Sequence, residues 1–118
     1  MTFPAPARLQ AELEAARQGL RAAAAMVAGG RDAFDASIDQ QRALAFCWVS
    51  VGSALKHYAR LAGIPQGHGP LAPAIQFRDK LAHQPLDRLA PEVVWETSIR
   101  DAPELLRVVE ALINDLRR

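Results

Sequence analysis

The chain has 118 residues, of which 50% are hydrophobic and 23% are charged, and its formal net charge at pH 7 is +1. A chain of this length forms one domain, here residues 1–118, and its nearly balanced charge excludes non-specific nucleic-acid binding through a strongly basic surface. The single cysteine, Cys47, excludes an intrachain disulfide and is expected to pack in the core. There is no signal-peptide pattern and no apolar run of ~20 residues, so we expect a cytoplasmic protein without a membrane span.

Helical periodicity predicts a first helix from about Pro6 to Val27. Its apolar positions are Leu9, Leu13, Ala16, Leu20, Ala24 and Val27. A second helical region runs from near Asp32 to about Leu61, and the capping box Ser37-x-x-Gln40 predicts a short turn before the long helix proper. Two apolar stripes make this helix the expected centre of the fold. They comprise Leu44, Cys47, Trp48, Val51, Leu55 and Tyr58 on one side, and Phe34, Ile38, Ala45 and Val49 on the other.

Prolines and glycines mark the ends of the remaining elements. Gly63–Pro70 is expected to be a turn-rich loop in which His68 is solvated, and no metal site is predicted. A third helix is expected from Ala72 or Pro73 to about Gln84, because Pro85 disfavours helical geometry at the residue before it.

Two shorter helices complete the prediction. One spans Pro91 to about Ser98, with burial anchors at Val93, Val94 and Trp95. The last begins after Asp101, an expected cap, and ends in two arginines that complement the helix dipole. Strand alternation is absent from the sequence, so the fold class is all-α, a compact four- to five-helix up-and-down bundle.

Chemically versatile side chains gather in the stretch Phe77–Pro85. Arg78 can bind phosphate oxygens through its guanidinium fork, and His83, in the last helical turn, can move a proton near neutral pH. The five-residue spacing separates them by about 140° around a regular helix. Convergence on one phosphate therefore requires a distorted helix end, or a cleft whose far wall comes from another element or a second subunit. The alternative is that these residues form a solvated helix surface.

Three patches of the sequence resemble the HepT-like branch of the HEPN superfamily, which are small helical ribonuclease toxins paired with minimal nucleotidyltransferase antitoxins. The segment Phe77–His83 resembles the signature of arginine, polar residue, three residues and histidine. Val51–Ala54 resembles an Ile-Gly-Glu-Ala stretch, and Glu92–Trp95 followed by Asp101–Leu105 resembles the C-terminal pattern. The resemblance covers roughly Asp32–Leu116.

Two positions depart from that family pattern. Pro85 stands where many members have a tyrosine that the partner nucleotidyltransferase modifies with AMP, so this mode of neutralisation is excluded at that position. Tyr58 is a remote substitute, and is expected to be a core residue like Trp48 and Trp95. Ser53 stands where the family often has glutamate, and it cannot hold a charge against Arg42 or Arg78.

The resemblance implies a HEPN-type two-fold homodimer and a metal-independent ribonuclease without a cofactor. The RNA 2'-hydroxyl would attack the adjacent phosphorus, leaving a 2',3'-cyclic phosphate and a 5'-hydroxyl. His83 is then the acid-base residue and Arg78 the charge clamp, while Asp79 orients one of them. Lys80 is a weaker candidate for contact with the RNA backbone.

Other interpretations stay open from the sequence. Arg42 and Ser53 are supporting residues, and we expect Arg42 to form a structural pairing inside the bundle. The whole surface could instead belong to a non-catalytic nucleotide- or RNA-binding module that partners a nucleotidyltransferase. A purely structural helical oligomer is the third possibility.

Overall fold

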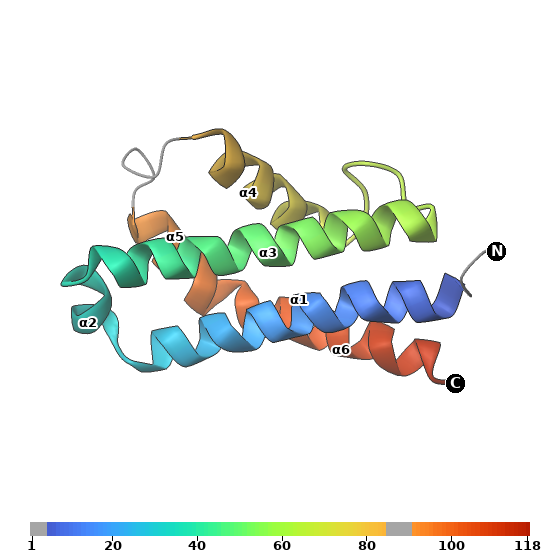
Figure 1. Cartoon of the computed structure of the whole chain (residues 1–118), viewed down its shortest axis with the longest axis horizontal. Helices are drawn as coiled ribbons and strands as arrows, with labels where there is room; N and C mark the ends of the chain where they lie inside the picture. The colour runs from blue at the N-terminus through green and yellow to red at the C-terminus, as the bar shows by residue number, and fades with distance from the viewer. Residues whose placement is uncertain (1–4, 85–90) are drawn as a thin grey trace.

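The computed structural model describes residues 5–84 and 91–118, and within these ranges the chain forms six helices and no strand (Figure 1). The all-α class is therefore confirmed for the described residues. One helix more than expected is present, because the turn predicted before the long helix is itself helical. The helices are α1 (Ala5–Ala28), α2 (Arg31–Asp35), α3 (Ile38–Ala62), α4 (Ala72–His83), α5 (Pro91–Arg100) and α6 (Ala102–Leu116).

The two longest helices, α1 and α3, lie side by side in opposite directions and give the molecule its elongated shape of 48 × 27 × 25 Å (Figure 1). Helix α6 packs along α1, and α4 packs on α3. The buried side chains of these helices form one continuous hydrophobic cluster, in which α3 contributes the most residues. The central position expected for α3 is thus confirmed.

Local sequence signals explain both ends of α3. Ser37 has extended backbone geometry, and its Oγ accepts a hydrogen bond from the Gln40 N–H at 3.2 Å, as the capping box predicts. At the other end Gly63 adopts a left-handed φ of 73°, and the Ile64 N–H donates to the Ala59 carbonyl at 2.9 Å. This six-to-one bond is typical of a Schellman cap, in which glycine is favoured because it has no Cβ.

Aromatic residues hold the centre of the core, as expected. Trp48 is 1% exposed, and its Nε1–H donates to Ser98 Oγ at 2.8 Å. The Ser98 hydroxyl in turn donates to the Val94 carbonyl at 2.7 Å, so this buried polar group is satisfied. Trp95 and Tyr58 are also buried, as is Cys47, where burial raises the pKa of the thiol.

Four expectations about apolar burial and helix capping are wrong. Ile38 and Val93 are exposed, because Ile38 is the first residue of α3 and Val93 lies about 100° around α5 from the buried Val94. On α1, Ala23 is buried where Ala24 was expected, since α1 turns a slightly different face to α3. Asp101 precedes α6 with helical backbone angles and forms no side-chain cap hydrogen bond.

None of the helices in the described part of the chain is long and apolar enough to cross a lipid bilayer.

Candidate functional site

The candidate site is built where α4 crosses α3 at Gly52. A Cβ added at Gly52 would lie 2.1 Å from Arg78 Cβ, 2.7 Å from Arg78 Cγ and 3.1 Å from the Ala74 carbonyl oxygen. The missing side chain therefore makes room for the stem of Arg78. A larger residue at this position would push α4 away and displace the guanidinium.

The Arg78 guanidinium is held by two side chains. Its Nε–H donates to Ser53 Oγ at 3.0 Å, and its Nη1–H donates to Asp79 Oδ1 at 3.0 Å. The same Asp79 oxygen accepts a hydrogen bond from Lys56 Nζ at 3.3 Å. The hydrogen bond from Arg78, with a smaller contribution from Lys56, lowers the pKa of Asp79 below its ordinary value. Arg78 is thus ordered by α3 and α4 together.

Ser53 orders this arginine, although it has no charge to offer. Its hydroxyl accepts the Nε–H, while Asp79 supplies the countercharge from the adjacent position on α4. The role predicted for Asp79, orienting Arg78, agrees with this geometry. With 28% of its side chain exposed and Nη2 without a hydrogen-bond partner among the described residues, Arg78 still presents donors to solvent.

His83 lies apart from this cluster. Helix α4 continues through His83, and Gln84 follows with extended angles, φ −111° and ψ 137°, as a residue before proline prefers. No distortion of the helix end brings His83 toward Arg78, so the first of the two routes to convergence is excluded. His83 is exposed, and among the described residues it forms no hydrogen bond with Arg78 or Asp79. Pro85 itself lies outside the described residues.

The remaining predicted residues have different positions. Lys80 is exposed on α4, and its side chain forms no hydrogen bond or ion pair with Arg78 or Asp79. Arg42 is exposed on α3, so the expected pairing inside the bundle is wrong. Tyr58 is only 7% exposed, and burial raises the pKa of its hydroxyl, which leaves it a core residue.

Sequence reasoning missed the part played by Lys56. It lies three residues after Ser53, so both side chains project from neighbouring positions on one face of α3. That spacing was the available signal, but it does not reveal which residue of α4 faces the pair. The contact with Asp79 depends on how the two helices cross.

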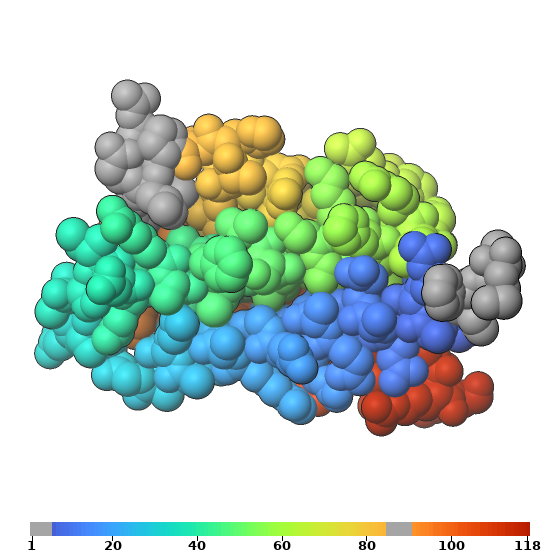
Figure 2. Space-filling view, in the orientation of Figure 1, coloured from blue at the N-terminus to red at the C-terminus, as the bar shows by residue number. Residues whose placement is uncertain are grey.

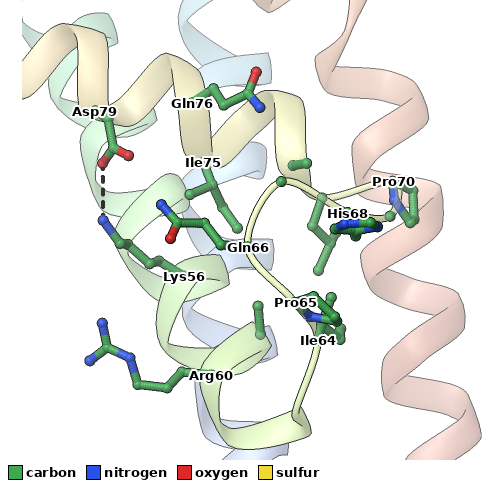
Figure 3. A pocket seen from close by; sticks show the side chains of 15 residues that line it. Lys56, Arg60, Ile64, Pro65, Gln66, His68, Pro70, Ile75, Gln76 and Asp79 are labelled. Carbon is green, nitrogen blue, oxygen red and sulfur yellow. Dashed lines mark hydrogen bonds and ion pairs between the residues drawn. The ribbon is translucent and has the colours of Figure 1, made fainter.

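A cavity of about 600 Å³ adjoins this network (Figure 3). It lies between the end of α3, the loop Gly63–Pro70 and the first two turns of α4, and the Lys56–Asp79 ion pair forms one edge. His68 belongs to its lining. Over residues 5–84 and 91–118, no three His, Cys, Asp or Glu side chains cluster so as to hold a metal ion.

A second cavity, of about 410 Å³, lies between α4 and α6. Its apolar lining includes Trp48, Phe77 and Leu105, and two carboxylates belong to its wall, Asp101 and Glu104. It is therefore acidic and apolar in character, and it does not favour a phosphate.

Solvent-exposed residues of α3 continue from the Arg78 network along the helix. Phe46 lies seven residues before Ser53, a spacing that keeps the two side chains on one side of the helix to within about 20°. Together with Arg42 they form what we call the open face of α3. Phe46 is 68% exposed there. Figure 2 shows α3 at the surface between α1 and α4.

Comparisons with known protein families, with curated proteins and with solved structures found no significant match to this chain.

Proposed function

We propose that the chain is a metal-independent endoribonuclease of the HepT-like HEPN type, the toxin of a toxin-antitoxin pair. One observation carries the proposal. Arg78 is fixed by Ser53 and Asp79 with free donors toward solvent, on the same helix whose last turn exposes His83. An ordered cation and an accessible imidazole are the two groups that RNA transesterification requires.

The chemistry follows from these two groups. The RNA 2'-hydroxyl attacks the adjacent phosphorus and loses its proton to an imidazole, while the 5'-oxygen leaves with a proton from a protonated imidazole. Arg78 Nη2 donates to a phosphate oxygen as negative charge grows in the transition state. A single His83 cannot be base and acid in the same step. A two-fold pair of chains supplies both, one imidazole from each protomer.

The proposed homodimer uses the open face of α3 and the adjoining surface of α4. A two-fold interface must be complementary to itself, and the open face offers Phe46, a large apolar side chain exposed beside polar residues. Pairing of these faces also brings two Arg78 side chains toward one groove. The second chain then supplies the far wall of a cleft in which Arg78 and His83 can act on one phosphate despite their separation on α4.

The proposed antitoxin is a minimal nucleotidyltransferase that neutralises the toxin by binding. The position occupied by tyrosine in related toxins is Pro85 here, and proline has no hydroxyl to accept AMP. Tyr58 is buried, so it offers no accessible hydroxyl in the folded chain. An antitoxin that covers His83 would block the reaction without any modification.

The decisive experiment is RNA cleavage in EDTA by the wild type and by His83→Ala. The rate should fall by about 10²- to 10⁴-fold, the usual contribution of a general acid or base, and the wild-type product should end in a 2',3'-cyclic phosphate. His57→Ala is the matched control, since His57 is an exposed histidine on α3 that faces Glu12. Equal activity of wild type and His83→Ala would refute the proposal.

A second candidate function is a non-catalytic nucleotide- or RNA-binding module that serves a nucleotidyltransferase. The separation between His83 and the Arg78 network favours it, because binding needs only the cation. The same assay distinguishes the two functions. Saturable RNA binding that Arg78→Ala weakens, with no cleavage by the wild type, would support the binding module.

A further inference from the structure

The cavity beside the loop Gly63–Pro70 carries an excess of positive charge. Lys56 and Arg60 lie one helical turn apart on α3, and Figure 3 shows both charged groups at the same edge of the cavity. The opposing carboxylate is Asp79, whose oxygen is already shared between Lys56 and Arg78. Arg60 forms no hydrogen bond or ion pair with any described residue. This edge therefore favours an anionic group on a ligand.

The rest of the lining suits a flat apolar ring that carries hydrogen-bonding groups at its edge. Ile64 and Ile75 are half-buried and lie on the loop and on α4, respectively, so they present apolar surface from two sides. Gln66 projects from the loop into the space between α3 and α4, and Gln76 lies on α4 (Figure 3). Each amide offers both donors and an acceptor, the pattern that matches the edge of a nucleobase.

From this combination we infer that the cavity is a binding site for a nucleoside phosphate. The phosphate lies against Lys56 and Arg60, and the base lies between Ile64 and Ile75 with its edge toward the glutamines. The cavity volume, about 600 Å³, is within the range of sites that hold small molecules. This site is distinct from the surface that bears His83, and the inference does not rest on ribonuclease activity.

The test is calorimetric titration of AMP into the wild type and into Arg60→Ala at low salt. The wild type should bind AMP saturably and more tightly than it binds adenosine or inorganic phosphate. Arg60→Ala should bind AMP about tenfold more weakly, the effect expected for loss of one charge-assisted contact. Because Arg60 is exposed and unpaired among the described residues, its removal should leave the helical circular dichroism spectrum unchanged.

Arg100→Ala serves as the matched control. Arg100 is exposed at the end of α5 and does not line the cavity, and its one ion pair within residues 5–84 and 91–118 is with Glu96 at 3.5 Å. The Arg100→Ala variant should bind AMP with the same affinity as the wild type. Equal affinity of wild type and Arg60→Ala would mean that AMP binds elsewhere and would overturn the inference, as would the absence of saturable AMP binding.

A nucleoside phosphate can come from a free mononucleotide or from the 5' end of an RNA. A 5'-phosphorylated deoxytrinucleotide, which has no 2'-hydroxyl to attack, separates the two sources. Tighter binding of the trinucleotide would show that the cavity binds the 5' end of an RNA. Tighter binding of AMP would show that it binds a free nucleotide. Since neither ligand is cleaved in these titrations, failure here and failure of the ribonuclease proposal are independent results.

Discussion

Gly52 allows the backbone of α3 to lie against the stem of Arg78, and replacing it tests how tightly the two helices fit. In Gly52→Ala the new methyl group would lie 2.1 Å from Arg78 Cβ, so α4 must shift. Overpacking of this kind costs about 1–3 kcal/mol, and we expect the free energy of unfolding in urea to fall by that amount. RNA cleavage should fall too, because the Arg78 guanidinium moves.

Gly29→Ala is the control for this substitution. Gly29 lies at the exposed end of α1, where an added Cβ would approach only the Met26 carbonyl oxygen, at 3.3 Å. A small adjustment of this helix end accommodates the methyl group, so the free energy of unfolding should change by less than about 0.5 kcal/mol. A loss as large as that of Gly52→Ala would show that the α3–α4 contact is not the cause.

Asp79 gives the Arg78 network a dependence on pH. Its pKa in the folded chain lies below the ordinary value of 3.8, so the carboxylate adds stability above that value and loses it as pH falls through the lowered native pKa. In Asp79→Asn this contribution is absent at every pH. The wild type should therefore be more stable at pH 7 by up to about 1 kcal/mol, the scale of a partly exposed ion pair.

Urea denaturation of both proteins between pH 7 and pH 2.5 checks this expectation. The two free energies of unfolding should converge in the acid range, where Asp79 in the wild type becomes protonated and resembles the amide. A difference that stays constant over the whole range would show that the carboxylate charge does not contribute.

The sequence alone identified Arg78 and His83 as candidates and placed His83 in the last turn of α4. It did not identify Lys56 as a partner of Asp79, nor Gly52 as the place where Arg78 fits. Both contacts join residues more than twenty positions apart, and they depend on the angle at which α4 crosses α3. Ser53 was expected to offer no charge to Arg78, and the structure shows its neutral hydroxyl accepting from Arg78 at 3.0 Å while Asp79 supplies the charge.

At the scale of the helices, two predicted caps behave differently and provide a matched pair of substitutions. Ser37 accepts a hydrogen bond from the Gln40 N–H, whereas Asp101 forms no side-chain cap hydrogen bond. Ser37→Ala should reduce the free energy of unfolding by about 1 kcal/mol, the usual cost of losing an N-cap. Asp101→Ala should be almost neutral. Thermal or urea denaturation measures both, and equal losses would contradict the assigned caps.

The helix bounds could be predicted closely because their signals are local. Ser37, Gly63 and the residue before Pro85 each constrain the backbone within a few positions, and the structure ends or begins a helix at these places. Burial was less predictable. Ile38 was assigned to an apolar stripe of α3 and Arg42 to a pairing inside the bundle, but both side chains are exposed.

For the whole molecule, the proposed homodimer makes Phe46 the most informative residue. Phe46→Asp places a charge on the open face of α3, where the wild-type side chain is 68% exposed in the single chain. Loss of a central aromatic contact costs about 2 kcal/mol or more, so the dissociation constant of the dimer should rise at least about 30-fold. Size-exclusion chromatography with light scattering should show the change, with cleavage lost in parallel.

Ile99→Asp provides the comparison, because Ile99 is also an exposed apolar residue, 45% exposed, but belongs to α5. It should leave the oligomeric state unchanged. A wild type that is monomeric at all concentrations would contradict the dimer, and so would dissociation caused equally by both substitutions.

Trp48, whose indole donates a buried hydrogen bond to Ser98, is an intrinsic fluorescence probe of the packing around α4. Trp48 touches α5 through Ser98 at 2.8 Å and α4 through the edge of Phe77, with ring centroids 5.6 Å apart. Phe77 immediately precedes Arg78 on α4. Any ligand or partner that tilts α4 must therefore alter the surroundings of this indole, and its fluorescence emission would register binding without an attached dye.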